Sequence, residues 1–546
     1  MTHSLILCRN VKIPVEFRSK EYHDEKAVEY VKRLYGNRVK GKLGDAEFFV
    51  YKKSVDARKI QNIVFIYTIG IILKNELDEK RIKSALTKDF EYVMSEEPDF
   101  EGMNGIMAKS EKPVVVGFGP SGLFCAYALA VAGLKPVIIE RGSDVDNRTE
   151  KVNRYWETGE LDINSNVQFG EGGAGTFSDG KLLTRIGDPL TSFVMKTFHR
   201  HGAPKEITYL SKPHVGTDLL KGIVKSMREE IKSYGGTVMF ESALTAIKTD
   251  SMGRATAVTV NNSFDIECTA VFLCIGHSAR DTFSVLRSLD MDITPKPFSV
   301  GVRIEHLQSD ISNALYGDFA ECEALEKAQY TLSAKNGDRG VYSFCMCPGG
   351  TVVASASDSD EIVTNGMSNY SRDGINANSA IAVSVNTSDY GNTVDGAIAF
   401  QKKIEQAAFK LAGSDGTAPI QLLGDYLNDR KTFGEPCRIM PTYTGKTKLC
   451  DINRVFPDFI NDSLKACFSV FEKQIKGFSV SDAVLTAPET RTSSPVRINR
   501  NEERVSVSAN NVYPCGEGAG YAGGITSAAV DGLKSAISYM NRLRGI

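Results

Sequence analysis

The sequence lacks an apolar run long enough to cross a membrane. Its longest apolar stretch, residues 63–73, spans 11 residues and contains Thr68 and Gly70, whereas a membrane-spanning helix needs about 20. The first residues also lack the basic region and apolar segment of a signal peptide. We therefore expect a soluble, cytoplasmic protein that does not contact a membrane.

The sequence also lacks a charge excess of either sign. Its 65 basic and 67 acidic residues leave a net charge of −2, which argues against a nucleic-acid-binding or membrane-binding surface along the whole chain. Residues 1–60 are locally basic and carry interleaved tyrosines and phenylalanines, a pattern that can bind RNA. Because residues 76–101 are acidic, a solvated face is favoured, and RNA binding stays an alternative.

Neither cysteine nor histidine spacing indicates a disulfide framework or a metal site. The 11 cysteines include no C-x-x-C pair, and the 7 histidines include no H-x-x-x-H pair. Cys345 and Cys347 are separated by one residue and would share one face of a strand, where we expect them to lie in the core. We predict reduced, mostly buried thiols and no metal.

The length of 546 residues predicts about three or four domains. Residues 1–94 are predicted to form a small α+β domain whose order resembles most of a ferredoxin-like unit, and residues 95–112 a linker. The elements predicted for residues 1–94 are a strand at 5–17, a helix at 21–34 stopped by Gly36, strands at 46–51 and 63–73, and a second helix. The second helix would carry Ile82, Leu86, Phe90 and Val93 on one face.

A Rossmann-like α/β pattern begins at Pro113 and changes near Pro295. Residues 298–305 alternate apolar and polar, which predicts a half-exposed antiparallel strand. We therefore predict a discontinuous α/β cofactor domain, with an α+β substrate domain inserted into it. The predicted bounds are 109–295 and 480–546 for the cofactor domain and 296–479 for the insertion.

The motif G-x-G-x-x-G occurs three times, and its first copy, Gly117/Gly119/Gly122, has the context of a dinucleotide site. It follows the apolar run 113–116, precedes a predicted helix at 121–132, and is followed by a second apolar run that ends at Glu140. Such glycines permit a tight turn and the approach of a pyrophosphate, while the acid binds the ribose hydroxyls. Glu140 would repel a 2′-phosphate, which favours FAD or NAD over NADP.

The other two copies are less specific by themselves. The second, Gly170/Gly172/Gly175, follows a poor strand, and the overlapping G-x-x-x-x-G-K lacks the hydroxyl of a P-loop because Leu182 follows the lysine. The second copy therefore predicts only a glycine-rich loop, residues 172–179, which either lies against a cofactor or is merely flexible. The third follows a short strand and the turn Gly516-Glu517, where an acid can bind polyol hydroxyls beside a helix that starts near Ile525.

Together these motifs resemble the glutathione-reductase-like FAD flavoproteins. The segments 168–182, 298–306 and 489–498 are similar to a bacterial family of largely uncharacterised FAD-dependent dehydrogenases, a resemblance that spans nearly the whole chain. It implies non-covalent FAD. The predicted cofactor-binding residues are Gly117, Gly119, Pro120, Ser121, Gly122, Glu140, Arg141, Gly173, Ala174, Gly175, Thr176, Ser178, Gly276, Gly516, Glu517, Gly523, Gly524 and Ile525.

Two features of the disulfide reductases in that superfamily are missing. Cys125 is a lone thiol in the first predicted helix, and no second dinucleotide motif lies between Gly276 and Val512. A redox disulfide is therefore not expected, and any NAD(P)H would visit the substrate cleft transiently.

The catalytic residues are left open by the sequence. Candidates near the flavin are His277, Arg280, Arg303, Arg491 and Arg497, since guanidinium groups bind planar oxyanions. They favour a dehydrogenase or reductase of a small anionic metabolite, with a flavin monooxygenase as an alternative. The oligomeric state is also left open.

Overall fold

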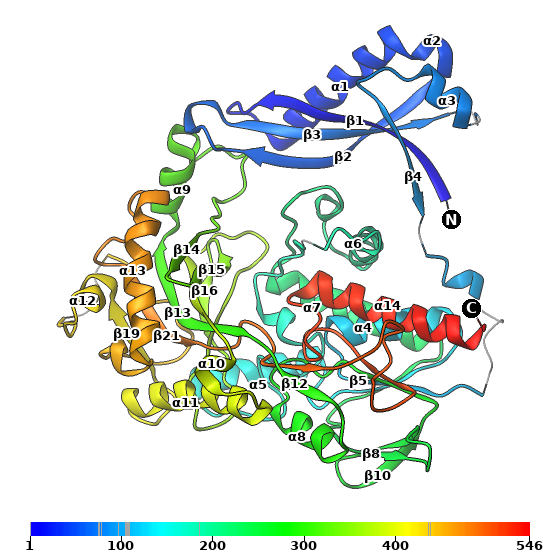
Figure 1. The fold of residues 1–546 in the computed structure, drawn as a ribbon. Coiled ribbons are helices and arrows are strands. Elements are labelled where there is room, and N and C mark those ends of the chain that lie inside the picture. The colour runs from blue at the N-terminus through cyan, green and yellow to red at the C-terminus, as the bar shows by residue number, and fades with distance from the viewer. Residues whose placement is uncertain are drawn as a thin grey trace.

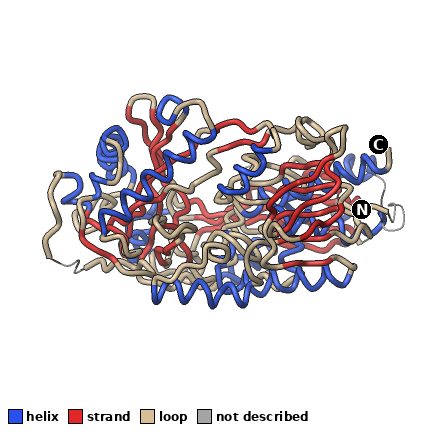
Figure 2. Tube along the Cα trace, turned by 90° about the horizontal axis from the view of Figure 1, so that it is seen from below, coloured by secondary structure: helices blue, strands red, loops and turns tan. Residues whose placement is uncertain are grey.

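The computed structural model describes residues 2–74, 77, 79–96, 98–103, 110–184, 186–434, 436 and 438–545. Three sheets organise this mixed α/β chain, and the N-terminal sheet lies apart from the other two (Figure 1). Seen from below, helices run along the outer edge of the molecule (Figure 2). The predicted linker, 95–112, lies partly outside the described residues. No described helix is long and apolar enough to span a membrane.

The N-terminal unit is a four-stranded antiparallel sheet with helices. Its strand order is β2-β3-β1-β4, which is the order of a ferredoxin-like unit. Its elements are β1 (Thr2–Pro14), α1 (Lys20–Arg38), α2 (Lys40–Leu43), β2 (Ala46–Asp56), β3 (Val64–Leu73), α3 (Glu79–Ala85) and β4 (Glu91–Glu96).

Two sequence predictions in this unit are wrong. Helix α1 continues past Gly36 to Arg38, because its buried face, which includes Val31 and Tyr35, packs on the sheet. The second helix ends at Ala85, and Val93 lies in β4, paired with Leu5 of β1. The chain after Ala85 instead supplies β4, which forms backbone hydrogen bonds with the free edge of β1.

A parallel five-stranded sheet, β23-β11-β5-β6-β7, forms the centre of the second unit. Strand β23, at one edge of this sheet, comes from the C-terminal segment, and α14 packs against α4 (Figure 1). A small antiparallel sheet of β8 (Leu244–Thr249), β9 (Ala255–Val260) and β10 (Phe264–Glu267) adjoins it. The other elements are β5 (Pro113–Val116), α4 (Pro120–Val131), β6 (Val137–Ile139), α5 (Val145–Thr158), α6 (Leu190–Arg200), α7 (Gly216–Ser233), β7 (Thr237–Met239), β11 (Ala270–Leu273), α8 (Arg280–Ser288), β23 (Val512–Pro514) and α14 (Ile525–Leu543).

The third unit is a seven-stranded mixed sheet of order β14-β15-β18-β13-β21-β19-β20. Its elements are β13 (Phe298–Leu307), α9 (Gln308–Tyr316), β14 (Ser333–Asn336), β15 (Arg339–Cys347), β18 (Asn376–Val385), α10 (Thr387–Tyr390), α11 (Val394–Ala412), β19 (Ala418–Leu422), α12 (Leu423–Leu427), β20 (Thr447–Leu449), α13 (Asp458–Gln474) and β21 (Val484–Glu489). Two smaller pairs, β16 (Thr351–Ala354) with β17 (Thr364–Met367) and β12 (Ile293–Pro295) with β22 (Val496–Ile498), complete the described strands.

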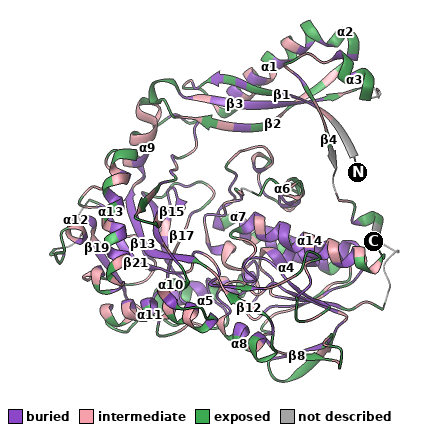
Figure 3. Ribbon diagram, in the orientation of Figure 1, coloured by how far each residue is buried: buried purple, intermediate pink, exposed green. Residues whose placement is uncertain are grey.

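This sheet corrects two further predictions. Strand β13 is buried on both faces rather than half-exposed. On one face Val300, Val302 and Ile304 lie in a hydrophobic core, and on the other Arg303 and Glu305 have buried polar partners. Strand β21 was assigned to the cofactor domain but pairs with β13 and β19, so the sheet extends beyond residue 479. Figure 3 shows how strongly α4, β13 and β21 are buried.

Candidate functional site

One cavity of about 350 Å³ lies at the carboxyl ends of β5, β11 and β23. Its walls come from the glycine-rich segments of the second unit and from β15, β17 and β21 of the third. In open α/β sheets, ligands bind at the carboxyl ends of the strands. This cavity is therefore the candidate site.

The first glycine turn joins β5 to α4 at the wall of the cavity. Gly117 has a φ of 93°, in the left-handed region that favours glycine. A Cβ at Gly122 would lie 1.9 Å from the Gly117 carbonyl oxygen, so helix α4 can approach the turn only without that side chain. Pro120 occupies the first turn of α4, and Gly119 caps the helix without a side-chain hydrogen bond. The helix N-terminus thus presents backbone amides and a positive dipole to the cavity.

The second glycine loop packs directly against the first. A Cβ built on Gly173 would lie 2.9 Å from the Cα of Gly119. The fully buried Arg148 of α5 shapes this loop, because its guanidinium donates to five backbone carbonyls. These belong to Asn166, Val167, Gly170, Glu171 and Gly173. Nothing in the sequence pattern around Arg148 indicated that this residue would hold the second glycine loop.

Glu140 lies at the end of β6 with only 5% of its surface exposed. Its carboxylate accepts hydrogen bonds from the backbone amides of Phe118, Gly142 and Gly170, at 2.7, 2.9 and 3.0 Å. Besides lining the cavity, this acid therefore ties the first glycine turn to the second glycine loop. Arg141 beside it lies over the ring of Phe169 and pairs with Asp281.

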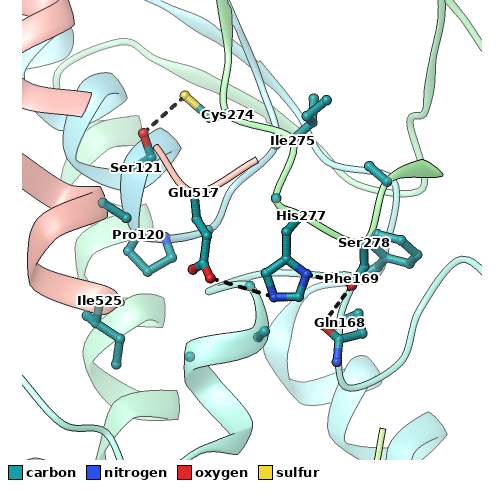
Figure 4. Close-up of a pocket in the computed structure, with 18 of the residues that line it drawn as sticks. Pro120, Ser121, Gln168, Phe169, Cys274, Ile275, His277, Ser278, Glu517 and Ile525 are labelled. Carbon is teal, nitrogen blue, oxygen red and sulfur yellow. Dashed lines mark hydrogen bonds and ion pairs between the residues drawn. The ribbon is translucent and has the colours of Figure 1, made fainter. Parts of the chain in front are cut away.

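A chain of polar groups crosses the cavity wall from Glu517 to Gln168 (Figure 4). The Ser278 hydroxyl donates to Gln168 Oε1 at 3.1 Å and lies 3.0 Å from His277 Nδ1, while His277 Nε2 lies 3.7 Å from Glu517. Burial lowers the pKa of His277 to about 3, assisted by Arg491 and Arg280. Its ring is therefore neutral, with a proton on one of its two nitrogens.

Burial also raises the pKa of Glu517 to about 7, against the attraction of Lys296. A carboxyl group whose pKa is higher in the folded state lowers stability as the pH rises from its ordinary pKa of 4.5 towards 7. Glu517 thus sits as a protonated or readily protonated acid in the cavity wall.

We expect Glu517→Gln to remove this pH dependence. Between about pH 5 and about pH 8, native protein should lose about 2–3 kcal/mol more unfolding free energy than the variant. Urea unfolding at both pH values measures the difference, and the exposed Glu503→Gln serves as the control. Equal pH dependence in all three proteins would contradict the raised pKa.

The candidate arginines are neutralised by carboxylates. Arg280 and Arg491 both pair with the buried Glu361 and Glu405, with nitrogen–oxygen distances of 2.7–3.2 Å. Arg303 forms a two-pronged pair with Glu489. Burying guanidinium groups without partners would be very unfavourable.

These ion pairs weaken the expectation that the arginines bind an anionic substrate. The fourth candidate, Arg497, lies over the ring of Tyr521 and does not line the cavity. Lys181 is a further cationic group on this wall, 3.5 Å from Asp179, whose carboxylate it shares with Arg372. In the sequence, Lys181 is the lysine of the G-x-x-x-x-G-K pattern, which was rejected as a P-loop, and it was not predicted as a site residue.

All but three of the predicted cofactor-binding residues line this cavity. Gly122 and Gly516 lie one layer behind it, since a Cβ on Gly516 would lie 2.7 Å from that of Ser121. Thr176 is also buried behind the wall, where its carbonyl accepts from Thr217. Other lining residues were not predicted as cofactor-binding, among them Lys181, Cys345, Asn365 and Glu489. The described residues contain no group of histidines, cysteines and acids that could hold a metal ion.

Comparison with known proteins finds one family model that matches part of the chain and one relative that covers most of it. Residues 297–492, which contain the seven-stranded sheet, match the family model "FAD-dependent protein, C-terminal domain-like". A protein of Clostridium beijerinckii, described as an uncharacterized protein, is 47% identical over 495 residues, which cover 89% of this chain and 91% of that protein. The chain belongs to the same family as this Clostridium protein.

The solved structures that match this chain are more distant. The flavin-dependent halogenase CmlS is 12% identical, with a TM-score of 0.35, and the match covers 80% of this chain and 58% of that one. A flavoprotein/dehydrogenase from Cytophaga hutchinsonii is 13% identical, with a TM-score of 0.35, over 80% of this chain and 79% of that one. Similarity at this level carries no argument about the reaction.

Proposed function

We propose that the protein is an oxidoreductase that holds FAD non-covalently in the cavity at the ends of β5, β11 and β23. The observation that carries this proposal is the meeting of two glycine loops, two helix N-termini and Glu140 in one cavity. The residues proposed to contact FAD are those predicted above that line the cavity: Gly117, Gly119, Pro120, Ser121, Glu140, Arg141, Gly173, Ala174, Gly175, Ser178, Gly276, Glu517, Gly523, Gly524 and Ile525.

The groups in the cavity have the chemistry that such a dinucleotide needs. Backbone amides at the start of α4 suit the pyrophosphate, and the remaining acceptor capacity of Glu140 suits a ribose. Glu517 would face the polyol chain, and the N-terminus of α14 at Gly524 offers further amides. FAD would supply the electron-transfer chemistry, while the protein contributes position, charge and exclusion of water.

The substrate is proposed to be a small molecule that binds between the second and third units. Lys181, Asn365 and Glu489 line this part of the cavity, so Lys181 replaces the arginines as the group that would attract an anionic metabolite. In this proposal the cofactor domain combines residues 109–295 with the C-terminal segment that follows β21, and any NAD(P)H would enter the same cleft transiently.

The purified protein is expected to be yellow and to release FAD on denaturation. Chromatography of the supernatant after heat or acid denaturation identifies the nucleotide, and the absence of flavin, or the release of NAD alone, would contradict the proposal. Anaerobic photoreduction followed by a screen of oxidants and reductants then identifies the reaction class. Oxygen consumption coupled to substrate hydroxylation would indicate a monooxygenase instead.

A further inference from the structure

Two thiols of β15 lie where the third unit meets the proposed flavin cavity. Cys345 lines the cavity, whereas Cys347 is fully buried behind it. This corrects the expectation that both belong to the core. The two side chains lie close enough for each to shift the pKa of the other.

A β-bulge produces this arrangement. Phe344 pairs with Ala380 and Cys347 with Asn378, so three steps along β15 oppose two along β18. Cys345 has a φ of 45°, a left-handed conformation that is uncommon for a residue with a side chain. Its carbonyl, displaced from the ladder, accepts hydrogen bonds from Arg303 Nη1 at 3.2 Å and from Cys347 Sγ at 3.3 Å. Such strained residues cluster at functional sites.

The surroundings favour a thiolate at Cys345. Interaction with the Cys347 thiol, together with the charges of Lys181 and Arg303, lowers the pKa of Cys345 to about 6, against the opposing effects of burial and of Glu489. Cys274, which also lines the cavity and contacts Cys515, differs, because burial raises its pKa well above the ordinary value. Since the thiolate is the reactive form of cysteine, Cys345 and Cys274 are chemically distinct.

We propose that Cys345 and Cys347 form a dithiol/disulfide couple that exchanges electrons with the flavin. The proposal rests on the proposed function and revises the expectation of a protein without a redox disulfide. On oxidation, the Cys345 thiolate and the Cys347 thiol form one S–S bond and release two electrons and one proton, all taken up by oxidised flavin as a hydride equivalent. Disulfide reduction is the reverse of this step.

Anaerobic reductive titration of the oxidised holoenzyme tests the couple. The native protein should consume about twice the reducing equivalents that its flavin alone requires, because the disulfide is a second two-electron acceptor. Cys345→Ser and Cys347→Ser should each show an about twofold drop, to the flavin's own requirement. Cys450→Ser is the matched control, since Cys450 is likewise half-buried but lies outside the cavity, and it should titrate as native protein does.

Peptide mapping by mass spectrometry provides a readout that needs no variant. The oxidised native protein should contain a peptide with a Cys345–Cys347 disulfide, which disappears after reduction. Flavin-containing native protein that takes up only the flavin's equivalents and lacks this peptide would overturn the couple but leave the proposed function intact. Loss of the extra equivalents in Cys274→Ser, but not in Cys345→Ser, would also overturn it. A protein without flavin would instead contradict the proposed function.

Discussion

Replacing Glu140 with arginine is expected to leave the purified protein without flavin. The carboxylate accepts from three backbone amides, of which Phe118 belongs to the first glycine turn and Gly170 to the second glycine loop. A guanidinium there would face those donors with further donors and would place a buried positive charge among them. We expect the ratio of flavin to protein absorbance to fall to background and the thermal midpoint to fall as well.

Two further variants separate charge from shape at this position. Glu140→Gln keeps the volume but turns one acceptor into a donor, so it should lose about 1–3 kcal/mol of stability and retain part of its flavin. Glu160→Arg, which changes an exposed glutamate on the surface, should keep its flavin. Full occupancy in Glu140→Arg would show that Glu140 does not lie at the nucleotide.

Replacing Glu405 with alanine is expected to destabilise the protein by about 3–5 kcal/mol, because one partner of a buried ionic cluster is lost. Glu405 is fully buried and accepts hydrogen bonds from Arg280, Arg491 and Thr490. Its removal leaves two arginines with Glu361 as their buried carboxylate. The free energy of unfolding in urea measures the loss.

The same cluster should weaken in acid. Burial alone would raise the pKa of Glu405, but the two guanidinium groups lower it far below its ordinary value of 4.5. Its contribution is therefore fully present above about pH 4.5 and is lost as the pH falls further. The exposed Glu157→Ala is the control and should change stability by less than about 0.5 kcal/mol. An equally small effect for Glu405→Ala would show that the cluster does not stabilise the fold.

Local patterns predicted much of the parallel sheet. The apolar run before Gly117 and the acid at Glu140 lie where the sequence placed them, because a buried strand, a glycine turn and a helix leave a continuous record in the chain. The half-exposed strand and the second N-terminal helix were predicted wrongly. In both cases the structure of the segment depends on its contacts with segments that are distant in the sequence. The local periodicity of apolar residues does not reveal such contacts.

The candidate site shows the same division. The glycine loops could be named from spacing alone, but nothing in the sequence indicated that Arg148 holds one of them by its backbone carbonyls. The arginines were predicted as substrate ligands because sequence shows charge and not partners. The fold buries them against Glu361, Glu405 and Glu489, where charge neutralisation is required.

By itself, the sequence determined the α/β class, the glycine turn at Gly117 and the acid at Glu140, since each depends on neighbours within about 30 residues. Only the tertiary structure decided that β21 belongs to the seven-stranded sheet and that β15 brings Cys345 to the cavity. It also set the charge of Glu517 and His277 through burial. These properties depend on contacts between distant segments and on the removal of water, which a linear pattern of residues does not encode.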